Sequence, residues 1–281
     1  MAPDCSGILL APGQSALLVC PLRGRPLKPG MIPDAKRAVR DYWNAAPCGS
    51  SLTVAEAGSK AFYDEIEAVR YQLEPFIPTF AEFERWRGKR VLEIGVGIGS
   101  DFVCFARAGS TLTGIDLTEA SIELVRKRLE LEGLDADLRV ADAEDLPFSD
   151  SSFDLVYSWG VLHHTPNTAR AVEEARRVLK PAGEARVMLY SRRSWVALGA
   201  WMRWALIRGR PWRSLTSVIA EHVESPGTRA FTQPELERLF ASFRNVEFVR
   251  YLTPHDRRVA GPIAALTGSI FGWFVGIRAM R

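Results

Sequence analysis

The stretch VLEIGVGIG at residues 91–99 decides the fold of this chain. Its apolar first half predicts a buried β-strand, and residues 100–107 are typical of a helix, so Gly95, Gly97 and Gly99 form the turn between them. Glycines let backbone N–H groups approach a ligand closely, and a helix N-terminus attracts electron-rich groups. The stretch therefore predicts a nucleotide-type ligand at a strand–turn–helix unit.

Acidic residues stand at or near the ends of the neighbouring predicted strands. Glu93 precedes the glycines, the second strand ends in Asp116, and the third leads to Asp142. A carboxylate at Asp116 is suited to accept both hydroxyls of a ribose, and one at Asp142 is suited to accept an adenine amine. Ser100 stands where a dinucleotide fingerprint has its third glycine, so the pattern departs from that fingerprint.

Two further strands complete the pattern. Residues 153–158 predict a fourth strand that runs into the pair His163 and His164. A helix over 168–179 and the turn LKPAG then lead to a fifth strand at 184–190. Strands that alternate with helices in this way are typical of an α/β protein with a parallel sheet.

With these motifs the chain resembles the class I S-adenosylmethionine (SAM) dependent methyltransferases, in particular the small-molecule branch that includes ubiquinone and menaquinone methyltransferases. The motifs that carry the resemblance are VLEIGVGIG, TGID, VADAEDLPF, FDLVYSWGVLHH and VLKPAG, over residues 88–191. It implies a Rossmann-like, seven-stranded, mostly parallel sheet with helices on both faces, with SAM as the cofactor and S-adenosyl-L-homocysteine as its product. The residues that it assigns to the cofactor are Glu93, Gly95, Gly97, Gly99, Asp116, Leu117, Asp142, Ala143 and Ser158.

Composition favours a soluble enzyme over other classes. The chain has 281 residues, 47% of them hydrophobic, and a formal net charge of only +3, which does not argue for nucleic acid. Its four cysteines lack the spacing of a secreted disulfide framework, and neither a signal peptide nor a long apolar run is evident. The sequence predicts a cytoplasmic enzyme with a small-molecule substrate and leaves its oligomeric state open.

The first 33 residues look like the two halves of a zinc ribbon. Cys5 and Cys20 each stand in a knuckle whose second cysteine is missing, with Ala2 and Arg23 in the other two positions. Structural zinc takes four ligands. We therefore predict a degenerate, metal-free arm over 1–33 and no metal site in the chain; a chance likeness is the alternative.

Residues 34–88 predict an N-terminal helical lid. Helices are expected to about Asn44, over 59–72 and over 79–86. The resemblance implies that such helices fold over the cofactor and form one wall of the acceptor pocket, whereas ordinary amphipathic packing is the alternative for each side chain. The lid residues predicted to reach the substrate are Tyr42 and Tyr71, in a catalytic role, and Arg70.

The histidine pair after the fourth predicted strand suggests a catalytic group. Methyl transfer from a sulfonium is an in-line displacement, in which positioning contributes about 7–11 kcal/mol and a general base roughly 10²–10⁴-fold. His163 is the predicted base, with Trp159 and His164 as substrate contacts. Because the pair is common in the family across different acceptors, a role in shaping the loop is the alternative. Trp159 also offers a ring face to the sulfonium.

Residues 192–213 are rich in arginine and tryptophan, and no acid occurs over 185–220. Their apolar part is too short to span a bilayer. We predict an inserted cap at 192–230, in which Arg192 and Arg193 bind an anionic acceptor through bidentate hydrogen bonds. Two alternatives remain, a helix that lies on a membrane surface and a packed cap whose arginines are solvated.

Residues 231–281 are predicted to complete the core that begins at 89–191. A helix is expected over 232–240, and strands over 246–252 and 271–278 form the antiparallel pair that closes the sheet in the family.

The predicted function is SAM-dependent transfer of a methyl group to an anionic or partly apolar metabolite, in natural-product biosynthesis. The alternatives are an RNA methyltransferase, a membrane-associated methyltransferase of a lipid or quinone-type acceptor, and a non-catalytic SAM-binding protein. The presence of all the cofactor acids argues against the last.

Overall fold

One seven-stranded sheet organises the chain, of which the computed structural model describes residues 32–268 and 270–281. The two cysteine knuckles predicted in the first 33 residues lie outside the described residues. The strands are β1 (Arg90–Ile94), β2 (Thr111–Asp116), β3 (Asp137–Val140), β4 (Phe153–Trp159), β5 (Leu179–Tyr190), β6 (Arg244–Tyr251) and β7 (Phe274–Met280).

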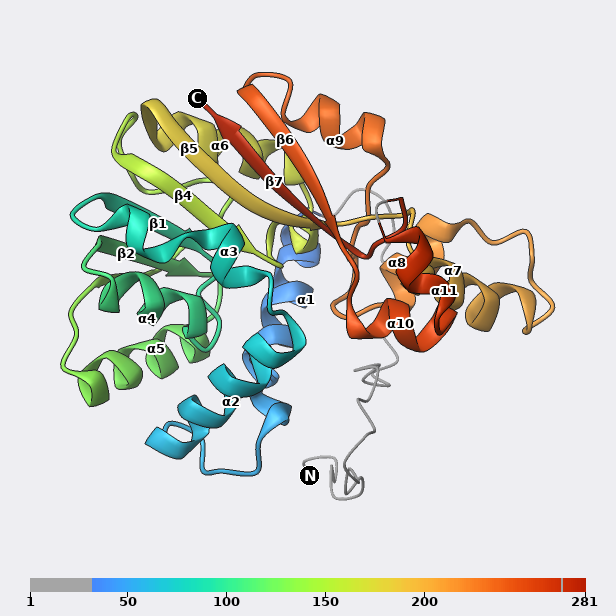
Figure 1. The fold of residues 1–281 in the computed structure, drawn as a ribbon, viewed down its shortest axis with the longest axis horizontal. Coiled ribbons are helices and arrows are strands. Elements are labelled where there is room, and N and C mark those ends of the chain that lie inside the picture. Colours follow the sequence, from blue (N-terminus) through green and yellow to red (C-terminus); the bar gives the residue numbers. More distant parts are fainter. Residues whose placement is uncertain (1–31, 269) are drawn as a thin grey trace.

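The strand order is β3-β2-β1-β4-β5-β7-β6 (Figure 1). The pairs among β1 to β5 are parallel, and β7 lies antiparallel between β5 and β6. The predicted seven-stranded, mostly parallel sheet with an antiparallel closing pair is therefore confirmed. The predicted LKPAG turn is instead a bulge within β5, because the partner of β4 shifts from Leu179 to Glu184.

Helices cover both faces of the sheet, so its central strands are buried on both sides. In β1, Val91 packs into one hydrophobic core and Leu92 into the other, as alternation along a strand requires. The first core also contains α4 (Ser100–Arg107) and α5 (Glu119–Glu132), whereas the second contains α6 (Thr168–Val178) and α9 (Gln233–Leu239) (Figure 1).

The predicted lid helices are largely as expected. Helix α1 spans Ile32–Ala45 and α2 spans Lys60–Leu73. The helix expected over 79–86 is instead the short α3 (Ile77–Ala81) followed by a 3₁₀ turn, since Glu82 between them has a left-handed backbone (φ 50°).

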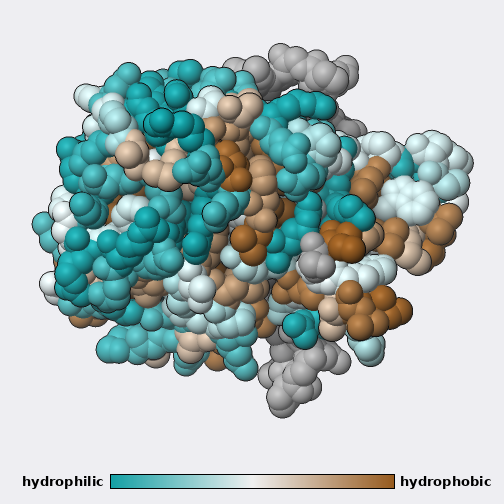
Figure 2. All heavy atoms as spheres, turned by 45° about the horizontal axis from the view of Figure 1, so that its top comes forward, coloured by the Kyte–Doolittle hydropathy of each residue, from teal (hydrophilic) through white to brown (hydrophobic). Residues whose placement is uncertain are grey.

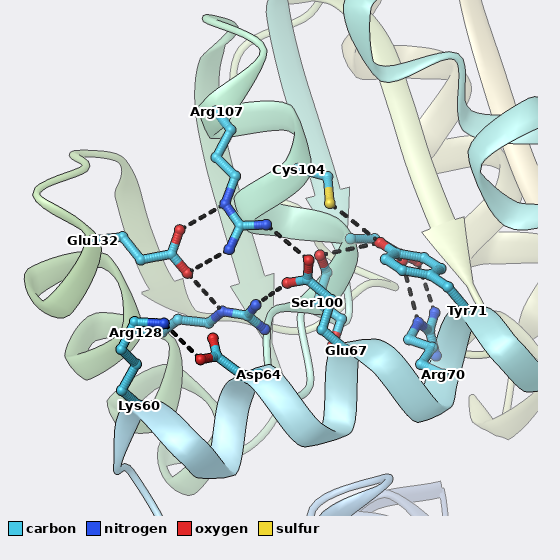
Figure 3. Close-up of polar contacts among 11 residues, drawn as sticks. Lys60, Asp64, Glu67, Arg70, Tyr71, Ser100, Cys104, Arg107, Arg128 and Glu132 are labelled. Atoms are coloured by element: carbon cyan, nitrogen blue, oxygen red, sulfur yellow. Dashed lines mark hydrogen bonds and ion pairs between the residues drawn. The ribbon is translucent and has the colours of Figure 1, made fainter.

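Ion pairs fasten α2 to the core (Figure 3). Glu67 of α2 pairs with Arg107 of α4 at 2.8 Å and with Arg128 of α5, and both arginines also pair with Glu132. The Arg128 side chain is only 1% exposed, so this network is a buried contact between α2 and the core and not a solvent-exposed ion pair.

The cap consists of two separate segments. The first contains α7 (Trp195–Trp201), a π-helical turn (Met202–Leu206) and α8 (Leu215–His222). The second, α10 (Pro254–Ala260) and α11 (Ile263–Thr267), lies between β6 and β7 and was not predicted. Because α10 packs on α7 (Figure 1), we propose that the cap comprises 254–267 as well as the predicted 192–230.

Candidate functional site

The glycine turn after β1 has the backbone that its sequence predicts. Gly95, Gly97 and Gly99 all have positive φ, of 81°, 54° and 83°. A Cβ on Gly95 would lie 2.2 Å from Val161, so this position tolerates no side chain. A Cβ on Gly97 would meet nothing within 4 Å, which leaves its backbone open to a ligand.

Asp116 at the end of β2 is bound to this turn. One of its carboxylate oxygens accepts the N–H of Gly97 at 3.1 Å, and the other accepts the N–H and hydroxyl of Thr118 at 2.9 and 2.8 Å. Burial raises the pKa of Asp116 despite these bonds. The carboxylate is thereby fixed beside the turn, where the resemblance assigns it to a ribose.

Asp142 is covered by the lid. Lys36 of α1 lies 2.5 Å from the Asp142 carboxylate and 2.7 Å from that of Glu144. A hollow of about 250 Å³ adjoins this contact. Its lining residues are Lys36, Arg37, Arg40 and Leu117. Helix α1 therefore lies over Leu117 and Asp142, two of the residues that the resemblance assigns to the cofactor.

Glu93 leaves a buried polar atom without a partner. The residue is 4% exposed, and its Oε2 finds no hydrogen-bond partner among the described residues. Burial, followed by the charge of Asp101, raises the pKa of Glu93 well above its usual range. Buried polar groups are almost always satisfied, so a bound cationic or hydrogen-bonding group is expected here. Ser158 uses its hydroxyl within the sheet, donating to the carbonyl of Ile94 at 3.0 Å.

Arg70 and Tyr71 of α2 converge on the buried carboxylate of Asp101 in α4. The Arg70 guanidinium donates to Asp101 at 2.7 and 3.2 Å, and the hydroxyls of Tyr71 and Tyr157 donate to it at 3.0 and 2.9 Å. Burial and the charge of Asp101 raise the pKa of Tyr71. In this structure both lid residues contact the chain itself, and we propose that they position the lid against the glycine turn.

Trp159 marks the end of β4. Its indole N–H donates to the carboxylate of Glu74 at 3.0 Å, and its ring packs against Phe80 with centroids 5.2 Å apart. Burial raises the pKa of Glu74, although the charge of Arg70 opposes the shift. Glu74 thus lies beside Trp159, which the sequence analysis predicted as a substrate contact.

His163, the predicted base, is fully buried. Its ring lies 3.6 Å from that of Tyr190, centroid to centroid, and neither of its nitrogens has a hydrogen-bond partner in the part of the chain that is described. Burial, followed by the charge of His164, lowers the pKa of His163 well below its usual range. It is therefore neutral at pH 7.

His164 instead belongs to a hydrogen-bonded cluster with the cap. Its Nε2 lies 3.2 Å from the carboxylate of Glu224, and its Nδ1 lies 2.8 Å from the hydroxyl of Ser225. The Tyr190 hydroxyl donates to both oxygens of Glu224 at 2.9 Å. His163, His164 and Glu224 also bring possible metal-ligand atoms within 4.8 Å of one another.

Charged groups from distant parts of the sequence act on the exposed Cys48. Desolvation by the surrounding protein raises the pKa of its thiol to about 12. The charges of Glu224, Glu74 and Asp116 also raise this pKa, whereas that of Arg70 lowers it. Groups of the lid, of the cofactor strand and of the cap therefore all act on one thiol.

Alkylation should reveal this environment. At pH 8 we expect iodoacetamide to modify Cys48 about tenfold to a hundredfold more slowly in the folded chain than in the urea-unfolded chain, because the thiolate is the nucleophile. The rate should rise with pH beyond pH 9, towards the thiol pKa of about 12. Mass spectrometry of the tryptic peptide that contains Cys48 measures both rates; equal rates would contradict the described surroundings.

The remaining predicted substrate residues contact the chain itself. Arg192 pairs with Glu235, whose carboxylate also accepts the N–H of Thr232 in the cap of α9. The Arg193 guanidinium lies 5.4 Å from the ring of Phe271. Tyr42 of α1 packs against its neighbour Trp43, with ring centroids 4.9 Å apart. Trp43 in turn lies 5.2 Å from the ring of His164.

Sequence reasoning missed the acids at the centre of this site. Glu74 ends a helix and carries no motif. Glu224 offered a weak signal, since it is one of the first acids after the acid-free run 185–220. Its left-handed backbone (φ 55°) is unusual for a non-glycine residue, and such conformations cluster at functional sites.

Comparison with known proteins supports the assignment of the core. Residues 92–187 match the family model described as "Methyltransferase domain". The chain is 42% identical over 98 residues to the phthiotriol/phenolphthiotriol dimycocerosates methyltransferase of Mycobacterium tuberculosis, and 36% identical over 101 residues to the ubiquinone biosynthesis O-methyltransferase of Actinobacillus pleuropneumoniae. Each match covers 34% of this chain, and 36% and 43% of the respective relative. The chain thus matches less than half the length of these relatives.

Solved structures share the fold over most of the chain. The cyclase SpnF aligns with a TM-score of 0.56 at 16% identity, covering 88% of this chain and 96% of that one. A SAM-dependent methyltransferase from Methanosarcina mazei aligns with a TM-score of 0.52 at 23% identity, covering 73% and 97%. At these identities the likeness shows the Rossmann-like fold alone, which hosts more than one chemistry.

Proposed function

From the premise that this chain belongs to the class I SAM-dependent methyltransferases, we propose that it transfers the methyl group of SAM to a hydroxyl of a small, largely apolar acceptor. The observation that carries the proposal is the Glu224 carboxylate, which lies 3.2 Å from Nε2 of His164, in the loop after β4, and accepts the hydroxyl of Tyr190 at 2.9 Å. The cradle around Gly97 and the unpartnered oxygen of Glu93 fit the cofactor.

The charges beside the predicted substrate residues indicate the kind of acceptor molecule. Glu74 lies beside Trp159 and Glu224 beside His164, and these acids disfavour an anionic acceptor there. Arg192 and Arg193, which the sequence assigned to an anion, contact Glu235 and Phe271 instead. We therefore propose a neutral, hydroxyl-bearing acceptor in place of an anionic one. A role in natural-product biosynthesis stays a prediction.

The relatives favour this class of acceptor over RNA. Those named above are methyltransferases of ubiquinone biosynthesis and of phthiotriol dimycocerosates, and none supports the RNA alternative. That this chain has the same class of acceptor is part of the proposal, because the matches cover only 34% of this chain.

We assign the proton acceptor to Glu224. When bound, SAM supplies a methyl group that its sulfonium activates, so the chain has to align the acceptor and remove its proton. When Nδ1 of His164 accepts the hydroxyl of Ser225, 2.8 Å away, its Nε2–H can donate to Glu224 beside the hydroxyl of Tyr190. A carboxylate held by two donors, with a side chain still 30% exposed, is placed to accept a hydroxyl proton. His163 then packs behind this cluster.

Calorimetric titration with SAM tests the cofactor assignment. Asp116→Ala should weaken SAM binding at least about tenfold, because a hydrogen bond to a charged group contributes roughly 1.5–3 kcal/mol. Asp135→Ala, which removes an exposed acid, is the matched control and should bind SAM like the unmodified chain. Unchanged affinity in Asp116→Ala would refute the role of Asp116, and failure of the unmodified chain to bind SAM would refute the proposed function.

A further inference from the structure

The cap exposes an unusual number of apolar side chains. Eight of the thirteen large hydrophobic residues exposed in the described part of the chain lie on it, and a ninth follows α11 by three residues. Figure 2 shows hydrophobic residues gathered at this end of the molecule. We call these nine residues the apolar face of the cap. They are Leu198, Met202, Leu206, Ile207, Trp212, Val259, Ile263, Leu266 and Ile270.

These residues lie on helices that form one unit. Leu198, Met202 and Leu206 follow one another at four-residue intervals along α7 and the π-helical turn. Helix α10 packs directly on α7, where a Cβ on Gly199 would lie 3.1 Å from Val259. The indole of Trp195 donates to Thr267 at 2.9 Å, which joins α7 to the end of α11.

The two segments that carry the apolar face hold only positive charges, since residues 192–213 and 257–271 contain no Asp or Glu. The exposed acid of the cap, Glu221 of α8, is paired with Arg213 at 2.6 Å. The cationic groups exposed on the cap helices and their connections are Arg203, Arg208, Arg210, Arg257 and Arg258. Monomeric soluble proteins rarely expose large apolar patches without a partner, and here the partner has to be apolar and anionic at once.

We propose that the apolar face of the cap docks on the surface of a bilayer that contains anionic lipids. Apolar side chains enter the interface, while the arginines bind lipid phosphates in bidentate fashion. A second copy of the chain is disfavoured as the occupant, because a two-fold contact through this face would oppose arginines with no acid to pair them. No helix among residues 32–268 and 270–281 is long and apolar enough to cross a membrane.

The docking surface adjoins the proposed acceptor site. Glu224 follows the end of α8 by two residues, and α8 packs on α7, which carries part of the apolar face. Docking would thus bring the site to the layer in which an apolar acceptor dissolves. This reason for docking rests on the proposed function, but the docking itself is measured without methyl transfer.

Flotation with vesicles tests the proposal. The probe is phosphatidylcholine vesicles with and without one quarter phosphatidylglycerol. We expect binding to the anionic vesicles that weakens with salt, and about tenfold weaker binding for the double variant Ile207→Asp, Leu266→Asp. The matched control is Val54→Asp, Val140→Asp, whose two valines are exposed outside the cap. SAM titration of each variant checks that it is folded and reports on the proposed function separately.

Three results would overturn the inference. Absence of binding to anionic vesicles would exclude the bilayer as the occupant. Equal loss of binding in the cap variant and the control would show that the apolar face is not the contact. A monomer–dimer equilibrium in sedimentation that only the cap variant abolishes, without vesicle binding, would assign the face to a second copy of the chain.

Discussion

Replacing Glu224 by Gln should lower kcat about 10²–10⁴-fold, the range typical of a lost general base, while the Kd for SAM stays unchanged. The amide keeps the size of the side chain but no longer takes the proton of an acceptor hydroxyl, and it meets the donors of Tyr190 and His164 with a donor of its own. The measurement is formation of S-adenosyl-L-homocysteine, with an acceptor found by screening hydroxyl-bearing apolar compounds.

Glu221→Gln is the matched control. Glu221 lies three residues earlier, on α8, and pairs with Arg213 at 2.6 Å, so its loss should leave kcat unchanged. A fall in kcat that is equal in both variants would point to a general effect on the cap and contradict the assignment. Loss of activity on chelation, restored by a divalent cation, would show that His163, His164 and Glu224 hold a metal instead.

The core could be predicted because its signals are local. The run 91–99 fixes a strand, a turn and a helix within a few residues, and the glycines do have the left-handed backbones that such a turn requires. The apolar strands of a parallel sheet are also recognisable individually, because they are buried on both faces. The order of the strands then follows from the family that these motifs resemble.

The second half of the cap could not be predicted in the same way. Helices α10 and α11 contain only seven and five residues, too few for a helical period to stand out in the sequence. Their positions depend on tertiary contacts, which the spacing of residues along the sequence does not reveal. The structure packs α10 against α7, some sixty residues earlier in the chain.

Only part of the candidate site could be predicted, because some of its contacts join distant parts of the chain. The predicted cofactor residues follow strands that the motifs identify, and Asp116 lies beside Gly97. The residues that meet them come from elsewhere: Lys36 reaches Asp142 across 106 positions, and Glu224 reaches His164 from the cap. Such pairs depend on how lid and cap fold over the sheet, which a single sequence does not reveal.

Asp256→Asn is expected to destabilise the cap by at least about 3 kcal/mol, since each hydrogen bond to a charged group contributes roughly 1.5–3 kcal/mol and unpaired buried donors add to the loss. The Asp256 side chain is fully buried. One oxygen accepts the N–H groups of Trp195 and Val196 at the start of α7, at 3.1 and 3.3 Å. The other accepts those of Thr253 and Trp273, both at 3.0 Å.

The amide would turn a donor towards some of these N–H groups, so both segments of the cap should loosen together. Urea denaturation measures the loss, and tryptic cleavage after Arg203 or Arg208 shows whether the cap opens before the core unfolds. Asp135→Asn, at an exposed acid, is the matched control. Because the glycine turn proposed to bind SAM lies between β1 and α4, local opening of the cap should leave SAM affinity intact. A loss of SAM binding in step with tryptic cleavage would show instead that cap and core unfold as one unit.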